Sequence, residues 1–148
     1  MSHPSSQAHK TLIEHFTEAI NERHVHKLDD FLDENVEEIL NSKAVYKGIQ
    51  GAREYYSMEH EAYPKGRWKI LEYLDDQHKN TIRARVLFDN KTYNTLYTFG
   101  PSGKIQEIET VYEGEYAFIY SNKELVLARI ALARVIMFYV LDTCIDRS

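Results

Sequence analysis

The chain has 148 residues, of which 43% are hydrophobic and 28% are charged, so it suits one globular domain with a substantial core. Eighteen basic and 23 acidic side chains give a net charge of −5, which disfavours a nucleic-acid partner because the phosphate backbone requires a dense basic face. A single cysteine, Cys144, excludes an internal disulfide, and the histidines lack the spacing of zinc ligands. We therefore expect a cytoplasmic location and no metal or organic cofactor.

The first part of the chain predicts helices. Apolar side chains recur at helical spacing over residues 12–20, and Thr11 with Glu14 forms a capping box at the start of this segment. Residues 1–10 are polar and lack an apolar core, so we expect a flexible lead and not a secretory signal. A short second helix is predicted over residues 26–32, and the two helices form a compact corner.

A short strand and a third helix follow. The pattern predicts a strand over Val36–Asn41, a loop over residues 42–47 and a helix over residues 48–62. Pro64 and Gly66 come just after that helix, where these residue types commonly end one.

From Arg67 onward the apolar residues recur at every second position, which is typical of β-strands. The four strands predicted in this part are Trp68–Leu74, Thr81–Phe88, Thr92–Phe99 and Lys104–Tyr112. The segments 89–91 and 100–103 have the chemistry of tight turns between strands. Helices followed by a meander of strands indicate an α+β fold, in which an antiparallel sheet carries helices on one face.

The alternation divides the residues of this sheet between two faces. One face is mainly apolar and aromatic, with Ile82, Ala84, Val86, Phe88, Tyr93, Thr95, Tyr97, Phe99, Ile108, Thr110 and Tyr112. The other face carries Arg83, Arg85, Glu107 and Glu109, which can form ion pairs across the strands. We therefore expect the first face to form the interior, and the second to lie in solvent or at an interface.

Four segments resemble one superfamily in their order and spacing. They are Ala19–Asn21 at the end of the first helix, Leu28–Val36 (LDDFLDENV), Gly48–Tyr56 (GIQGAREYY) and Gly103–Ile105 in the last strand. The chain resembles the nuclear transport factor-like superfamily of cone-shaped α+β domains, and especially its SnoaL-like and ketosteroid isomerase-like branch. The resemblance covers about residues 8–113 and implies a curved antiparallel sheet wrapped around the N-terminal helices as a cone-shaped barrel, with a pocket inside. We expect the domain itself to span residues 11–120.

The resemblance also allows the catalytic positions to be compared one by one. The isomerase branch uses a tyrosine, a general-base aspartate and a protonated aspartate, and the matching positions here are Phe16, Leu40 and Thr95. The acid of SnoaL-like cyclases matches Thr110, whereas a supporting tyrosine late in the third helix is retained as Tyr56. The resemblance therefore implies a member without the isomerase residues, in a superfamily of isomerases, cyclases, dehydratases, epoxide hydrolases and non-catalytic modules.

Glu38 is the candidate catalytic residue. Its place in the predicted strand puts it on the concave side, where loss of solvent raises the pKa of a carboxyl group and makes it an acid or base near neutral pH. The alternative is a position at the rim, or a strand shifted by one residue, which turns every side chain to the opposite face.

An apolar, aromatic pocket is predicted around Glu38. Tyrosine and threonine hydroxyls of the concave face converge there as donors to a ligand, or the same side chains simply fill the core. The predicted ligand-binding residues are Phe16, Leu40, Tyr56, Trp68, Val86, Thr95, Tyr97, Ile108, Thr110 and Tyr112.

The C-terminal segment lies beyond the resemblance. Residues 115–120 are expected to prolong the last strand, and Ser121 with Glu124 starts a helix whose residues 125–141 are apolar on nearly every side. Two arginines interrupt this run, which is shorter than the roughly twenty residues that a membrane span needs. We expect residues 121–148 to form a subunit interface, with membrane attachment, or a tail partly disordered or swapped between chains, as alternatives.

Two functions remain open. The first is a SnoaL-like homodimer or larger homo-oligomer that binds a small apolar ligand, with cofactor-independent isomerase, cyclase or hydrolase chemistry at Glu38. The second is a non-catalytic dimerisation or assembly module whose cone is filled by its own side chains. They differ in one structural feature, because a receptor or an enzyme has to leave a cavity beside a polar group.

Overall fold

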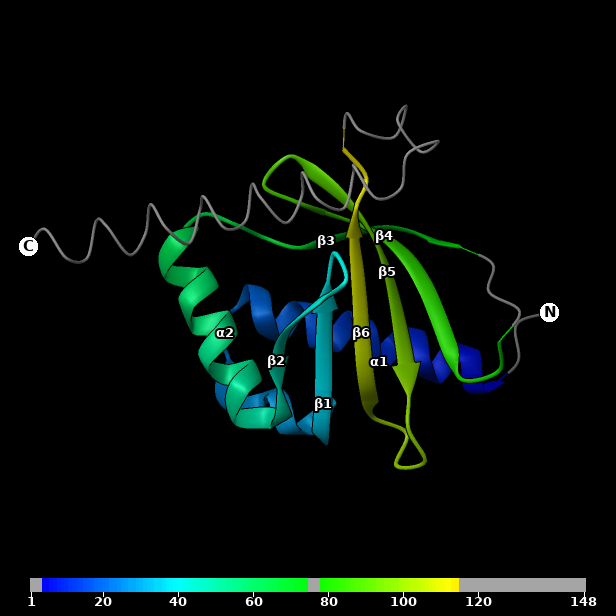
Figure 1. The fold of residues 1–148 in the computed structure, drawn as a ribbon. Helices are drawn as coiled ribbons and strands as arrows, with labels where there is room; N and C mark the ends of the chain where they lie inside the picture. The colour runs from blue at the N-terminus through cyan, green and yellow to red at the C-terminus, as the bar shows by residue number, and fades with distance from the viewer. Residues whose placement is uncertain (1–3, 75–77, 115–148) are drawn as a thin grey trace, which may run out of the picture. The chain divides into compact units, whose positions relative to one another are not determined.

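The computed structural model describes residues 4–74 and 78–114, which form helices packed on a six-stranded sheet (Figure 1). In chain order the elements are α1 (Pro4–Asn21), the 3-10 helix η1 (Val25–Asp30), β1 (Leu32–Leu40), β2 (Lys43–Lys47), α2 (Gly48–Ala62), β3 (Lys69–Leu74), β4 (Thr81–Phe88), β5 (Lys91–Phe99) and β6 (Ile105–Tyr112). The predicted α+β class is confirmed. The strand expected at 115–120 and the helix expected at 125–141 lie outside the described residues.

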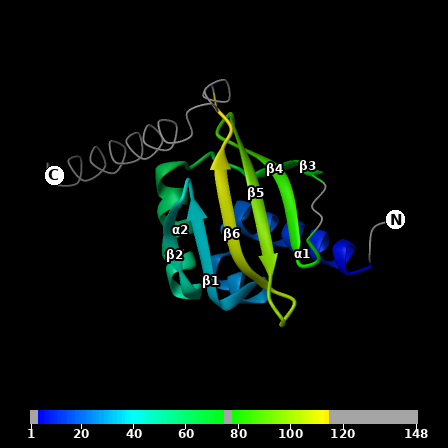
Figure 2. The same cartoon turned by 45° about the vertical axis from the view of Figure 1, so that its right-hand side comes forward.

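The sheet is mixed, with the strand order β2-β1-β6-β5-β4-β3. Strands β3 to β6 form the predicted antiparallel meander, but β1 pairs with β6 in parallel, so the expectation of a purely antiparallel sheet is wrong at this pair. Parallel neighbours need a long crossover, which α2 and the meander provide between β1 and β6. The edge strands β2 and β3 do not pair with each other, so the curved sheet is open and not the closed barrel that was expected (Figure 2).

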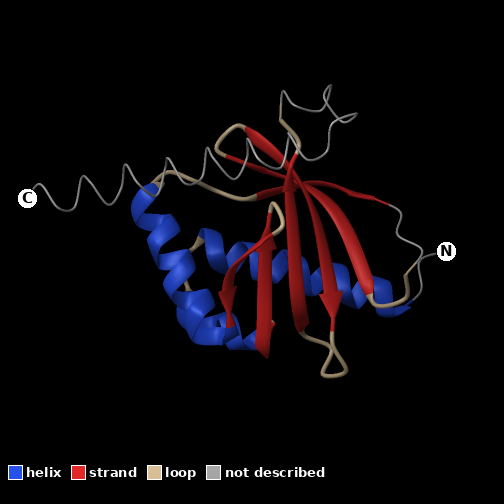
Figure 3. Cartoon of the chain, viewed as in Figure 1, coloured by secondary structure: helices blue, strands red, loops and turns tan. Residues whose placement is uncertain are grey.

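Both long helices lie on one face of the sheet (Figure 3). Helix α2 packs against β1 and β2, and α1 contacts β4 and η1. Alternate residues of β4 are buried beneath the helices, as the period-two pattern predicts. The largest fully buried side chains are Ile13, Leu28, Leu32, Val36 and Ile105. The helices and the sheet therefore share one apolar core, and the site described below lies within it.

Helix α1 begins earlier than the capping pattern predicts. It starts at Pro4, so residues 4–10, which we expected to be a flexible lead, are the first turns of the helix. The Thr11 hydroxyl donates a hydrogen bond of 3.0 Å to the carbonyl oxygen of Gln7, four residues earlier. This bond is typical of a threonine inside a helix, so Thr11 does not cap the helix.

Strand β2 occupies the segment 42–47, where the sequence predicted a loop. Asn41 and Ser42 both adopt positive φ angles, 50° and 69°, and form a two-residue hairpin turn between β1 and β2. The strand is only five residues long, too short for a clear period-two pattern. The extra strand matters for the site because it contributes Tyr46.

The outer face of the sheet carries the predicted charges, but their partners differ from the expectation. Arg85 forms ion pairs with Glu72 at 3.2 Å and Glu113 at 3.0 Å, and Arg83 donates a hydrogen bond to Asn94 at 2.6 Å. The proposed pairing of these arginines with the two glutamates of β6 is therefore wrong, because the neighbouring strands and the end of β6 supply nearer partners.

Within residues 4–74 and 78–114, no helix is both long and apolar enough to cross a membrane.

Candidate functional site

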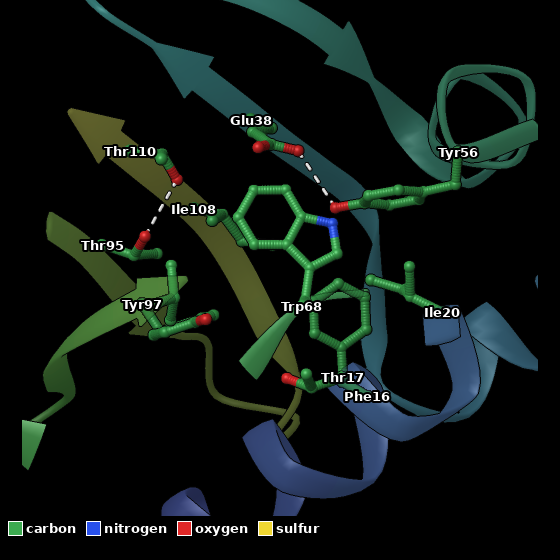
Figure 4. A pocket seen from close by; sticks show the side chains of 11 residues that line it. Phe16, Thr17, Ile20, Glu38, Tyr56, Trp68, Thr95, Tyr97, Ile108 and Thr110 are labelled. Atoms are coloured by element: carbon green, nitrogen blue, oxygen red, sulfur yellow. Dashed lines mark hydrogen bonds between the residues drawn. The ribbon is translucent and has the colours of Figure 1, made fainter. Parts of the chain in front are cut away.

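Glu38 lies on the concave face of the sheet, as its position in the strand predicted. It belongs to β1, is 5% exposed, and sits two residues after the fully buried Val36. The hydroxyl of Tyr56, on α2, donates a hydrogen bond of 3.0 Å to Glu38 Oε2 (Figure 4). The rim position and the shifted strand are therefore excluded for Glu38.

A second tyrosine extends this contact. The Tyr46 hydroxyl lies 3.0 Å from the Tyr56 hydroxyl, and both side chains are buried. Either hydroxyl can donate the hydrogen between them, and Glu38 acts on both tyrosines. The two hydroxyls and the Glu38 carboxylate form one hydrogen-bonded group. Sequence reasoning missed Tyr46, because its segment was expected to be a loop.

The tyrosines near Glu38 remain protonated over the physiological range. Burial raises the pKa of the Tyr46 and Tyr56 hydroxyls well above the ordinary value, and the charge of Glu38 raises it further. Burial, followed by the same charge, also raises the pKa of Tyr97. These three groups act as hydrogen-bond donors and not as bases near neutral pH.

Two threonines lie on neighbouring strands of the concave face. Thr95 of β5 stands directly opposite Thr110 of β6, and their hydroxyl oxygens are 3.2 Å apart. They are 2% and 3% exposed, and one hydroxyl donates a hydrogen bond to the other. The pair forms a second polar spot in a surface that is otherwise apolar.

Trp68 lies across the middle of the group (Figure 4). Its backbone is fixed by Asn21, which accepts a hydrogen bond of 2.7 Å from Trp68 N and donates one of 2.8 Å to Trp68 O. Its indole Nε1 donates a hydrogen bond of 2.7 Å to Glu59 Oε1. The ring also stacks on Phe88, with centroids 4.5 Å apart and an angle of 22° between the planes.

These side chains surround a small hollow. The centre of a water molecule can move within about 30 Å³ of it. The lining residues are Phe16, Thr17, Ile20, Glu38, Tyr56, Trp68, Val86, Thr95, Tyr97, Ile108 and Thr110. A space of this size holds about one or two water molecules. The hollow therefore combines a carboxylate, hydroxyl groups and aromatic faces, with little open volume in this conformation.

Solved structures with this architecture exist, although their sequences differ widely from this one. No protein-family model matches the sequence, and no curated protein sequence matches it. A protein of the SnoaL-like family from Agrobacterium tumefaciens superposes with a TM-score of 0.63 at 19% identity, over 73% of this chain and 99% of that one. The chain has the SnoaL-like fold.

Two further structural neighbours have names that describe activities. A SnoaL-like polyketide cyclase from Agrobacterium tumefaciens matches with a TM-score of 0.60 at 18% identity, over 76% of this chain and 96% of that one. The epoxide hydrolase/cyclase-like enzyme SalBIII, with a role in pyran ring formation in the polyether salinomycin, matches with 0.61 at 17% identity, over 74% and 92%. At such identities the likeness shows the fold alone.

Most of the predicted pocket residues meet in the hollow of this SnoaL-like domain. Leu40 and Tyr112 are the exceptions, and neither lines it. Both lie at strand ends and are half-buried; Leu40 precedes the β1–β2 turn, and the Tyr112 ring packs beside Tyr93 with centroids 5.5 Å apart. They therefore lie apart from the other predicted pocket residues. Side-chain alternation gives the face of the sheet but not the distance from the centre of that face.

Two lining residues were missed in α1, namely Thr17 and Ile20. The signal was available for Ile20, because it lies one helical turn after Phe16 and shares its face. As for metals, no group of three His, Cys, Asp or Glu side chains with suitable geometry occurs in residues 4–74 and 78–114. The lining residues of the hollow offer one carboxylate and several hydroxyl groups.

Proposed function

We propose that the chain binds a small, mainly apolar molecule in the hollow, and that Glu38 transfers a proton to or from it as a general acid or base. The observation that carries this proposal is the burial of Glu38, 5% exposed, in an aromatic hollow with a tyrosine hydroxyl 3.0 Å from its carboxylate. The proposal needs no metal and no organic cofactor.

The burial of Glu38 supports a function because it is unfavourable for folding. Moving a carboxylate out of water costs several kcal/mol, even when hydrogen bonds replace part of the lost solvation. An apolar residue of similar size would fill the same space without that cost. A buried acid in a hollow is therefore a reasonable candidate for catalysis.

Tyr97 supplies a donor for the ligand. Its side chain lines the same hollow as Glu38, and the charge of Glu38 acts on its hydroxyl. Because the raised pKa keeps that hydroxyl protonated, Tyr97 can stabilise negative charge that develops on a substrate oxygen while Glu38 moves the proton. This division of roles suits isomerisation, ring closure or epoxide opening. The polyketide cyclase and the epoxide hydrolase/cyclase-like enzyme among the structural neighbours favour these reaction types.

One observation favours a second function. The open volume of about 30 Å³ is far below the size of an organic ligand, which is the expected state of a cone filled by its own side chains. In that case the domain is an assembly module, and Glu38 with its tyrosines is a buried polar network without substrate.

Mass spectrometry distinguishes the two functions. Under native conditions, protein purified without added ligand should carry a small apolar molecule at near one per chain, and denaturing extraction should release it for identification. Turnover of that molecule should be lost in Glu38→Gln, which keeps an acceptor for Tyr56 but cannot ionise. An empty protein that also fails to bind apolar compounds would favour the assembly module.

We also propose that the chain forms a homodimer through residues 121–148. The apolar composition of residues 125–141 supports this, because a helix without a polar face needs a partner surface. Deletion of residues 121–148 should convert the dimer to monomers or aggregates, measured by size-exclusion chromatography with light scattering. A deletion variant that remains a dimer would contradict the proposed interface.

A further inference from the structure

The hollow cannot accept an organic ligand in the conformation described. Its open volume is about 30 Å³, whereas a cavity that binds benzene in another protein measures about 150 Å³. If the chain binds a ligand as proposed above, at least one lining side chain has to move first. The inference that follows rests on that proposed function and asks which side chain moves.

Exposure points to Trp68. The lining residues are buried except Thr17 and Trp68, which are half-buried and so form the boundary between the hollow and solvent. Thr17 is small, sits in the middle of α1 and donates a hydrogen bond of 2.7 Å to Ile13 O. Trp68 precedes β3, and its side chain is the larger by far. Movement of Trp68 opens more volume than movement of any other boundary residue.

The hydrogen bonds of Trp68 separate its backbone from its ring. Two bonds to Asn21, of 2.7 and 2.8 Å, hold the backbone in place. The ring is held by one bond to Glu59, by stacking on Phe88 and by a tilted contact with Tyr93, with centroids 5.6 Å apart. A rotation of the side chain therefore breaks the bond to Glu59 and these two ring contacts, and leaves the backbone bonds to Asn21 in place. Changes of this kind need no movement of the fold.

We propose that Trp68 is the gating residue of the site. Its indole rotates outward and a flat, uncharged, ring-containing ligand takes the vacated volume, next to Glu38 and Tyr97. The hydrogen bond from Trp68 Nε1 to Glu59 stabilises the closed position of the indole. The ligand is flat because it replaces an indole, and it is not an anion because no basic residue lines the hollow and Glu38 is acidic. Trp68 thereby sets which ring systems fit.

The hydrogen bond between Trp68 and Glu59 leads to a prediction that does not follow if Trp68 has a purely structural role. When the binding-competent state is rarely populated, the apparent dissociation constant is the intrinsic one divided by the fraction of open molecules. Glu59→Leu removes the acceptor and raises that fraction, so it should tighten binding although Glu59 does not line the hollow. Glu59→Gln keeps an oxygen acceptor, and Glu61→Leu places the same apolar side chain at an exposed position of the same helix.

The experiment uses 2-naphthol, a flat neutral probe with one hydroxyl, and the full-length chain. Calorimetry gives the dissociation constants. Acrylamide quenching of tryptophan fluorescence reports the solvent exposure of the Trp68 indole directly, because Trp68 is the only tryptophan of the chain. Glu59→Leu should bind about tenfold more tightly than the wild type, with increased quenching. Glu59→Gln and Glu61→Leu should stay within about threefold of the wild type.

Trp68→Ala, or Trp68→Phe if the alanine variant does not fold, removes the gating indole itself. If the probe binds to this variant and to the wild type, and Glu59→Leu shows no gain in affinity, the gating role of Trp68 is overturned and the ligand-binding function remains supported. Binding to the Trp68 variant alone would mean that the ring is a permanent part of the core. This result overturns the gating role of Trp68 and favours a filled cone. Absence of binding in every variant would overturn both proposals.

Discussion

The two faces of the sheet use the same residue type in opposite ways. On the outer face, Glu113 meets the guanidinium of Arg85 at 3.0 Å, and Glu72 meets it at 3.2 Å. On the concave face, Glu38 is 5% exposed and receives a hydrogen bond from Tyr56. On the outer face, Glu72 and Glu113 form ion pairs with Arg85. On the concave face, Glu38 is buried beside aromatic rings.

The difference shows that environment, and not residue type, decides what a carboxylate does in this fold. An exposed ion pair contributes little to stability because solvent already stabilises both charges. A buried carboxylate strains the fold but reacts more readily, since its proton affinity depends strongly on the few groups around it. Four experiments test whether the two faces differ to this extent.

The largest effect is expected for Tyr56→Ala. The substitution removes a buried ring that lies 6.0 Å from Phe16 and 5.6 Å from Tyr46, centroid to centroid, together with a hydrogen-bond donor to Glu38. It should lower the free energy of unfolding by about 3–5 kcal/mol, measured by urea denaturation. Tyr112→Ala, at a half-buried position, is the control and should cost clearly less.

Replacing Glu38 itself should give a smaller loss that depends on the substitute. Glu38→Ala leaves the Tyr56 hydroxyl without its acceptor and should destabilise the protein by about 1–3 kcal/mol. Glu38→Gln keeps an acceptor and should change stability by less than about 1 kcal/mol. Equal losses in the two variants, from denaturation curves at neutral pH, would show that the hydrogen bond to Tyr56 does not matter for stability.

The concave tyrosines should make the protein sensitive to alkali. Their pKa values are raised in the folded state, so above about pH 10 the unfolded chain loses protons that the folded chain keeps. The contribution of these tyrosines to the free energy of unfolding should therefore be constant below about pH 9 and fall by about 1.4 kcal/mol per pH unit for each such tyrosine above pH 10. Tyr97→Phe should reduce this slope by the contribution of one tyrosine. An unchanged slope in denaturation measurements would contradict the role assigned to its burial.

The smallest effect is expected on the outer face. Arg85 is exposed to solvent, so Arg85→Ala should shift the denaturation midpoint only slightly at low salt. The remaining difference from the wild type should disappear in about 1 M salt, where the Debye length is about 3 Å. A loss as large as that of Glu38→Ala would remove the contrast between the two faces.

Local sequence signals predicted the elements whose patterns are complete within one segment. Strand β4 was predicted with its observed bounds, because its first six residues alternate between polar and apolar and every second residue is buried. Helix α2 was also predicted correctly, since Pro64 and Gly66 follow it directly. The inward direction of Glu38 followed from the same alternation in β1. Each of these features depends on residues close to one another in the chain.

Features that depend on distant contacts were not predicted. The parallel pairing of β1 with β6 joins segments separated by a helix and four strands, and no local pattern records it. The hydrogen bond between Tyr46 and Tyr56 requires β2 to form beside β1. The position of Trp68 across the hollow depends on Asn21 and Glu59, from two different helices. Period and spacing give the face on which a residue lies, whereas its partner depends on packing of the whole domain.

The sequence by itself therefore determined the class of fold, the course of the meander and the face occupied by the acid, because secondary structure and side-chain alternation are local properties. Only the tertiary structure decided that two tyrosines form a hydrogen-bonded group with Glu38, and that Trp68 leaves about 30 Å³ beside it. The volume of a cavity is the space left over by side chains from several elements, and it changes with the rotamer of one of them.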